Sequence, residues 1–147
     1  MVLAGAGNEP EPVYAWMSES GDGSASLIYG SPETAEDLVF ILTCRNQDKA
    51  TGLTVYVDIP DTEVADPVDI NLAAAGGTKL TIGGAIDTDE MSGFHFAVAE
   101  DFKIKPLIAL LKETGEVAVT TGSVVTKLPE KGRGAELANF AGACTLD

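Results

Sequence analysis

Apolar and polar residues alternate along most of the chain, which is the pattern of β-strands that bury one face. The clearest example is LTVYVDI at 53–59, where every second residue is apolar. The same period of two recurs in VDINL at 68–72, KLTIGG at 79–84 and GFHFAVA at 93–99. Each of these segments is therefore predicted to be a strand.

Short strands separated by turn residues extend this pattern towards both ends of the chain. Further candidate strands are YAWM from 14, SASLIY from 24, EVAVTT from 116 and SVVTKL from 123. Turn signals such as GDG at 21–23 lie between strands, since glycine and aspartate tolerate the backbone of tight hairpins. These features predict a mostly β fold: an antiparallel β-sandwich or partly open barrel with one inserted helix and one C-terminal helix.

Two segments depart from the period of two and are predicted to be helices. KPLIALLKETG, at 105–115, has a proline suited to a first helical turn and a glycine suited to the position just past the end. GAELANFAGAC, at 134–144, places Leu137, Phe140 and Cys144 at helical spacing. We therefore expect Cys144 to lie on the buried face of the last helix.

The most apolar run is DLVFILTC, residues 37–44, and it ends on the first of two cysteines. Residues 38–42 are apolar on both faces, which predicts a central strand that is covered on both sides. On this strand Cys44 shares a face with Leu38, Phe40 and Leu42, because side chains alternate.

Both cysteines are thus predicted to face apolar surroundings, and two states are compatible with this. If the last helix packs across the end of the central strand, Cys44 and Cys144 form a disulfide. The loop closed would be about 100 residues long, for which the chain-entropy estimate is about 4.7 kcal/mol. Such a bond persists only in an oxidising compartment. The alternative is a pair of free, buried thiols, since free cysteine behaves as a small hydrophobe.

Length and charge limit the classes of partner. The chain has 147 residues, 45% of them hydrophobic, which suits one folded domain. We expect 13–147 to be a single β-rich domain and 1–12 to be an extended lead-in, left by a cleaved signal peptide or added by cloning. No stretch approaches the roughly 20 apolar residues that cross a bilayer, so no membrane insertion is expected. The net charge of −14 argues against nucleic acid and anionic membrane surfaces as partners.

Most residue patterns of active sites and metal sites are missing from the sequence. A single histidine, His95, cannot form a paired-histidine metal site, and two distant cysteines cannot form a zinc ribbon. His95 points away from Phe94 and Phe96, so a solvated strand residue is expected. No G-x-S-x-G motif occurs. We therefore predict no catalytic residue, no cofactor and no enzyme activity.

The segment DTDE, at 87–90, contains the candidates for a metal site. Asp87, Asp89 and Glu90 offer the oxygen ligands that calcium prefers, but the full spacing of an EF-hand loop is missing. The prediction is a solvated hairpin tip without a metal, and calcium binding is the alternative.

The order of three segments resembles a known group of proteins. A strand ends in ILTC, the segment LIALLKETGEVAV runs from a helix into a strand, and AELANFAGAC forms a terminal helix with a cysteine. In this order, residues 13–147 resemble small exported proteins of α-proteobacteria, the nearest groups being the invasion-associated locus B family and periplasmic accessory proteins of type VI secretion. The resemblance implies a periplasmic or secreted β domain with a bridge between Cys44 and Cys144, and it brings no catalytic residue.

Together these patterns predict a non-enzymatic exported module of the bacterial cell envelope that binds a protein partner or assists an assembly. The alternatives are a small hydrolase or thiol enzyme, and an acidic calcium-dependent binding domain. A deep pocket with converging polar groups would favour an enzyme, whereas a flat face or an exposed strand edge would favour a binding module. Neither the identity of the partner nor the oligomeric state follows from the sequence.

Overall fold

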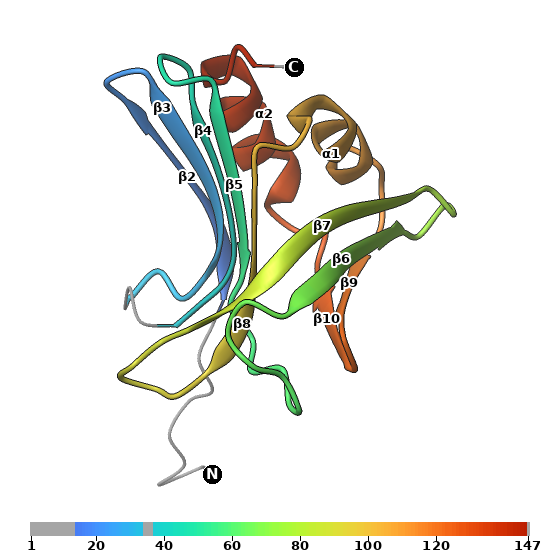
Figure 1. Ribbon diagram of the computed structural model, residues 1–147. Helices are drawn as coiled ribbons and strands as arrows, with labels where there is room; N and C mark the ends of the chain where they lie inside the picture. The colour runs from blue at the N-terminus through green and yellow to red at the C-terminus, as the bar shows by residue number, and fades with distance from the viewer. Residues whose placement is uncertain (1–13, 34–36, 147) are drawn as a thin grey trace, which may run out of the picture.

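One strongly curled antiparallel sheet makes up most of the molecule (Figure 1). The computed structural model describes residues 14–33 and 37–146, and in these residues the chain forms nine strands and two helices. The strands are, in chain order, β2 (Ala15–Gly21), β3 (Ser24–Gly30), β4 (Leu38–Arg45), β5 (Ala50–Val55), β6 (Pro67–Ala74), β7 (Lys79–Thr88), β8 (His95–Glu100), β9 (Val117–Thr121) and β10 (Val124–Leu128). The helices are α1 (Ile104–Leu111) and α2 (Arg133–Ala143).

The strand order across the sheet is β10-β9-β6-β7-β8-β5-β4-β3-β2, and every neighbouring pair is antiparallel. The mostly β fold with one mid-chain and one C-terminal helix is therefore as predicted, and of the two architectures considered it is the open, half-barrel one. The lead-in predicted at 1–12 lies outside the described residues.

The core lies on the inner face of the curl. Cross-strand pairing places Leu27, Leu42, Leu53 and Ala99 in one row over four neighbouring strands, and each is buried. These side chains share a face because alternate residues of a strand point the same way. Full burial of one leucine side chain contributes about 1.5–3 kcal/mol, so this row is a substantial part of the stability.

Both helices pack on that inner face (Figure 1). Helix α2 contacts β2 and β3, helix α1 contacts β6 and β7, and the two helices contact each other. Leu107, Leu110 and Leu111 form a buried apolar stripe on α1, and Leu137 and Phe140 of α2 are buried too. The helices therefore fill the space that the curled sheet surrounds.

A buried arginine joins the two helices. Arg133, the first residue of α2, donates hydrogen bonds to the carbonyl oxygens of Leu111 (2.8 Å), Glu113 (2.6 Å) and Gly115 (3.0 Å). A further hydrogen bond reaches the carbonyl of Pro129 (3.3 Å). Burial lowers the pKa of the guanidinium from its ordinary value. The cation lies beside the last carbonyls of α1, the helix end at which positive charge is favourable.

Among the described strands, β2 and β10 lie at the two edges of the sheet, and the segment that follows β10 links them. The indole Nε1 of Trp16 donates to the carbonyl of Pro129 (2.9 Å), and the hydroxyl of Ser18 donates to Glu136 in α2 (2.9 Å). The gap between the edges is thus crossed by side chains and by α2 rather than by backbone pairing.

Two expectations about the helices need correction. The helix predicted at 105–115 begins at Ile104 and already ends at Leu111, so Gly115 lies in the following loop. The last helix ends at Ala143, and Cys144 follows it with an extended backbone, so this cysteine is buried but is not part of the helical face.

Strand β4 is covered on one side rather than two. Its inner residues Phe40, Leu42 and Cys44 are fully buried, as expected. Its outer residues Val39 and Ile41 are only half-buried. The prediction of two covered faces was wrong because both helices lie on the inner side of the sheet.

Candidate binding site

The outer face of the sheet carries a row of largely apolar side chains. Pairing across five strands aligns Met17, Ile28, Ile41, Thr54 and Val98. Each of these residues is half-buried. This row is largely apolar, like the core residues of the inner face. The described helices, however, pack on the inner face of the sheet.

This face is hollowed beyond Ile41, where β4 begins and β5 ends. The hollow has a volume of about 690 Å³. Its lining comes from three segments distant in sequence: Asp37, Leu38, Ile41, Tyr56, Asp89, Met91, Ser92 and Phe94.

The start of β4 forms one wall, and a glycine on β3 makes this possible. The pairing of β3 with β4 shifts register between Tyr29 and Gly30, so that Gly30 pairs with Leu38. A Cβ atom at Gly30 would lie 2.7 Å from the carbonyl oxygen of Asp37 and 2.8 Å from Cδ2 of Leu38. Only glycine permits this close approach, which brings Asp37 and Leu38 to the hollow.

The β7–β8 hairpin forms the opposite wall and extends beyond the sheet, at the lower left of Figure 1. Asp89 organises its tip: Oδ1 accepts a hydrogen bond from the backbone N–H of Met91 (2.9 Å), and the backbone N–H of Asp89 donates to Phe94 (3.0 Å). Gly93 has a φ of 74° and donates to the carbonyl of Asp89 (2.7 Å). Such a turn follows from an aspartate that bonds its own backbone two residues on, with glycine at the left-handed position.

Tyr56 connects the two walls. Its hydroxyl donates a hydrogen bond to the carboxylate of Asp89 and lies 3.3 Å from the hydroxyl of Ser92. The hydrogen bond to Asp89 raises the pKa of Tyr56, and the same bond lowers the pKa of Asp89. The ring of Tyr56 lies 4.7 Å from that of Phe96 and 5.8 Å from that of Phe94, between centroids.

Two apolar side chains at the hollow are exposed. Met91 exposes 93% of its surface and Phe94 exposes 37%. Single exposed apolar residues are ordinary on a protein surface. Here, however, both line one hollow together with Leu38, Ile41 and Tyr56. Exposed apolar surface that is contiguous and rimmed by polar groups is typical of interaction sites.

The charge around the hollow has one sign. Asp37 and Asp89 line it, and its described lining contains no lysine or arginine. The sequence has no lysine or arginine in 50–78 or in 80–102, and the one histidine there, His95, is on the inner face of β8. Arg45 lies at the far end of β4. The hollow therefore presents apolar groups next to unbalanced negative charge.

The three calcium candidates are used differently in the structure. Asp89 bonds Tyr56 and its own turn, and Oδ1 of Asp87 accepts a hydrogen bond from the backbone N–H of Thr88 (2.8 Å). Glu90 is exposed at the tip. Among the described residues, no group of three or more histidine, cysteine, aspartate or glutamate side chains is placed to hold a metal ion.

The side chain of His95 is less solvated than expected. It shares the inner face of β8 with the buried Ala97, is half-buried itself, and its Nδ1 lies 2.7 Å from the carbonyl oxygen of Thr62. Because a carbonyl only accepts hydrogen bonds, Nδ1 carries the proton in this contact. Phe94 and Phe96 point to the opposite face from His95, as predicted. That face, however, is the outer face of the sheet, and His95 is on the inner one.

The sequence pattern did not identify Tyr56 or Met91 as site residues. The available signal was the turn motif DEMSG at 89–93, in which an apolar methionine occupies a hairpin tip otherwise made of polar residues and glycine. An exposed methionine at such a tip is a hint of contact with a partner.

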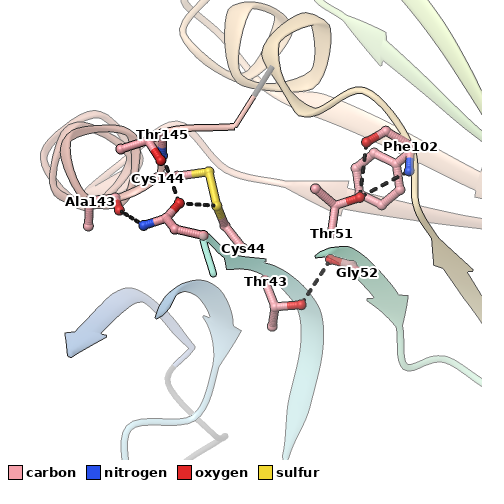
Figure 2. The surroundings of a disulfide bond; sticks show 9 residues. Thr43, Cys44, Thr51, Gly52, Phe102, Ala143, Cys144 and Thr145 are labelled. Carbon is pink, nitrogen blue, oxygen red and sulfur yellow. Dashed lines mark hydrogen bonds between the residues drawn. A yellow bond between two sulfur atoms is a disulfide. The ribbon is translucent and has the colours of Figure 1, made fainter. Parts of the chain in front are cut away.

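The disulfide predicted between Cys44 and Cys144 is present (Figure 2). The sulfurs are 2.05 Å apart and the Cα atoms 5.9 Å apart. The bond joins the residue after α2 to the end of β4 that lies away from the hollow. It fastens the C-terminal segment to the sheet.

Asn46 adds two hydrogen bonds beside the disulfide. Its Nδ2 donates to the carbonyl of Ala143 (2.8 Å), the last residue of α2, and its Oδ1 accepts from the backbone N–H of Thr145 (2.9 Å). One side chain thus satisfies backbone groups on both sides of Cys144, which are left without helical partners where a helix ends.

A second, smaller hollow of about 410 Å³ lies on the outer face near the other end of the same strands. Hydroxyl groups and one charge of each sign contribute to its lining, including Ser26, Thr43, Thr54, Arg45 and Glu100. The exposed apolar side chains of the first hollow have no counterpart among the residues that line this one.

The hollow beside Tyr56 is suited to bind an apolar group next to a cation. The sequence matches no protein-family model, no curated protein and no solved structure. Within the described residues, no helix has the length and apolar character needed to cross a membrane.

Proposed function

We propose that this protein is a non-enzymatic, exported binding module of the bacterial cell envelope, and that it holds a segment of a protein partner in the hollow beside Tyr56. One observation carries the proposal: Met91 and Phe94 are exposed at the hollow. Apolar side chains held in water by an ordered hairpin become favourable when a partner covers them.

The hollow is suited to a segment of a protein. Its apolar groups lie on a paired sheet and on a hairpin fixed by Asp89, so little order has to be gained on binding. A half-open hollow on a sheet accepts one or two anchoring side chains of an extended or helical segment.

The disulfide between Cys44 and Cys144 supports the exported location, because such bonds persist in oxidising compartments. A periplasmic or secreted location stays a prediction, as does the similarity to the invasion-associated locus B family and to type VI secretion accessory proteins.

Selection from a library of random peptides displayed on phage tests the binding site. The oxidised protein would be the bait, and enriched peptides would be titrated against the double variant Met91→Ser, Phe94→Ser. We expect this variant to lose at least about tenfold in affinity, since truncation of central interface anchors costs more than about 1 kcal/mol each.

The matched control is Val125→Ser, which changes an exposed apolar residue (55%) on β10. This variant should bind the peptides like the parent, and circular dichroism should show all the variants folded. Selected peptides that bind the parent and the double variant equally would show that the hollow is not the binding site.

The location is tested on the product of the native gene. Cell fractionation should find it outside the cytoplasm. Intact mass after thiol alkylation under denaturing, non-reducing conditions should show two unmodified cysteines. Recovery from the cytoplasm with two alkylated cysteines would contradict the exported location.

A further inference from the structure

Two kinds of surface meet in the hollow, and the first of them is apolar. Leu38, Ile41 and the rings of Tyr56 and Phe94 lie around one space, with Met91 at its rim. This lining can cover one aliphatic or aromatic side chain of a partner. The aromatic ring of Phe94, which is 37% exposed, is also a surface to which a lysine or arginine cation is attracted.

The second surface is anionic. Asp37 and Asp89 line the hollow, and within the described residues neither carboxylate forms an ion pair. The ion pairs found there are Arg45 with Asp48 (3.7 Å) and Lys127 with Glu116 (3.4 Å), both made of residues that do not line the hollow. In the part of the chain that the structure describes, no cation therefore balances the negative charge at the hollow.

The net charge of the protein limits which classes of molecule can bind in the hollow. A second copy of this chain would bring a further net charge of −14 to the same place, and the two would repel each other. Nucleic acids and anionic membranes carry the same sign and are disfavoured for the same reason. A basic segment is attracted by the whole field as well as by the two carboxylates.

We infer that the hollow binds a protein segment in which an apolar side chain is flanked by lysine or arginine. The apolar side chain occupies the space beside Tyr56 and Phe94, and the flanking cations lie at Asp37 and Asp89. The inference rests on the proposed function, because it names the chemistry of the segment that the hollow holds.

The test uses three synthetic peptides with blocked ends, titrated into isotopically labelled, oxidised protein at low salt and followed by NMR. The first has a leucine–phenylalanine centre flanked by two lysines on each side. The second replaces the lysines by glutamates, and the third keeps the lysines but replaces the centre by serines. We expect the first alone to shift the amide signals of Leu38, Tyr56 and 89–94.

Charge variants then locate the cations. Asp37→Asn and Asp89→Asn should each weaken binding of the first peptide about two- to fivefold, the range of an exposed ion pair, and added salt should weaken it further. Glu19→Gln removes the same charge from an exposed residue of β2 and should leave the affinity within about twofold, because it is not part of the hollow.

Four results would overturn the inference: equal binding of the glutamate peptide, equal binding of the serine peptide, shifts confined to other parts of the sheet, or no shift with any peptide. Equal binding of the serine peptide would indicate a site for cations of any kind, small polyamines included. If phage-selected peptides still depend on Met91 and Phe94 in any of these cases, the proposed function stands and only the partner's chemistry is wrong.

Discussion

The hydrogen bond between the Tyr56 hydroxyl and the Asp89 carboxylate joins the end of β5 to the tip of the β7–β8 hairpin. It lowers the pKa of Asp89 from the ordinary value of a carboxyl group. A carboxyl whose pKa is lower in the folded state adds stability above its unfolded pKa, and this contribution is lost as the pH falls through the folded pKa. The link between the two walls of the hollow is therefore strongest at neutral pH: it weakens in acid, where Asp89 takes up a proton, and in strong base, where the Tyr56 hydroxyl loses the proton that it donates.

We expect Tyr56→Phe to raise the pKa of Asp89 towards its ordinary value, because the strongest donor to the carboxylate is removed. The backbone N–H of Met91 still donates, so part of the lowering should persist. Carboxyl carbon NMR signals followed against pH measure this. Ser92→Ala is the control and should cause a smaller shift; a larger one than Tyr56→Phe causes would contradict the assignment.

Arg133 also depends on specific neighbours, because its guanidinium donates hydrogen bonds to backbone carbonyls at the end of α1 and in the loop that follows. Replacing it by methionine leaves the carbonyl oxygens of Leu111 and Glu113 without their donor. A buried polar group left unpaired costs about 1–3 kcal/mol, so the free energy of unfolding should fall by at least that amount in urea denaturation. Arg133→Lys should recover only part of the loss, since an ammonium group lacks the planar fork.

The exposed Lys131 provides the comparison. Lys131→Met should change the free energy of unfolding by no more than about 0.5 kcal/mol, as surface substitutions do. Equal effects of Arg133→Met and Lys131→Met would show that the buried hydrogen bonds contribute little.

Alternation along the chain correctly predicted the strands, but it could not decide which face of each strand is inside. In β8 the outward residues Phe96 and Val98 are larger and more apolar than the inward Ala97 and Ala99. The small residues Ala97 and Ala99 are buried inside, whereas Phe96 and Val98 are half-buried on the outer face. When both faces carry apolar residues, only tertiary packing distinguishes them.

The candidate site was harder to predict than the fold, because it depends on contacts between distant segments. The loop at Asp89 was identified as a hairpin tip, but nothing local in the sequence brings it to Tyr56. Nor does the local sequence show that Gly30 leaves the space into which the backbone of Asp37 fits. By contrast, the pairing of Cys44 with Cys144 could be predicted, since both follow apolar runs and no other cysteine competes.

At the scale of elements, α2 holds the inner face of the sheet through packing. Phe140 is 1% exposed, and we expect Phe140→Ala to cost about 3–5 kcal/mol of the free energy of unfolding. Urea denaturation should show this loss in both oxidising and reducing buffer. Asn139→Ala, on the exposed side of α2, should have little effect; a similar loss for both would mean that the helix is not packed through Phe140.

The disulfide contributes separately, through cross-linking. Cys144→Ser should lower the free energy of unfolding by about 2–5 kcal/mol under oxidising conditions. In reducing buffer it should unfold with nearly the same midpoint as the reduced parent. Cys44→Ser removes the same bond and should give a similar loss, and an unchanged midpoint for both variants would show that the bond does not stabilise the fold.

At the scale of the whole molecule, negative charge opposes compactness. A net charge of −14 repels itself, and salt screens this repulsion over distances of about 10 Å at 0.1 M. We expect the urea midpoint to rise as sodium chloride is increased to about 0.3 M, where screening is strong. A midpoint that falls would indicate that ion pairs such as Lys127 with Glu116 outweigh the repulsion.

The position of the disulfide also has a consequence for biosynthesis. Cys144 comes after every strand of the described chain and lies 100 residues after Cys44. The ribosome therefore makes all of these strands before the second thiol exists, so oxidation can only close a chain whose sheet is already synthesised. With two cysteines in the sequence, one intramolecular pairing is possible, and an oxidase suffices without an isomerase to correct it.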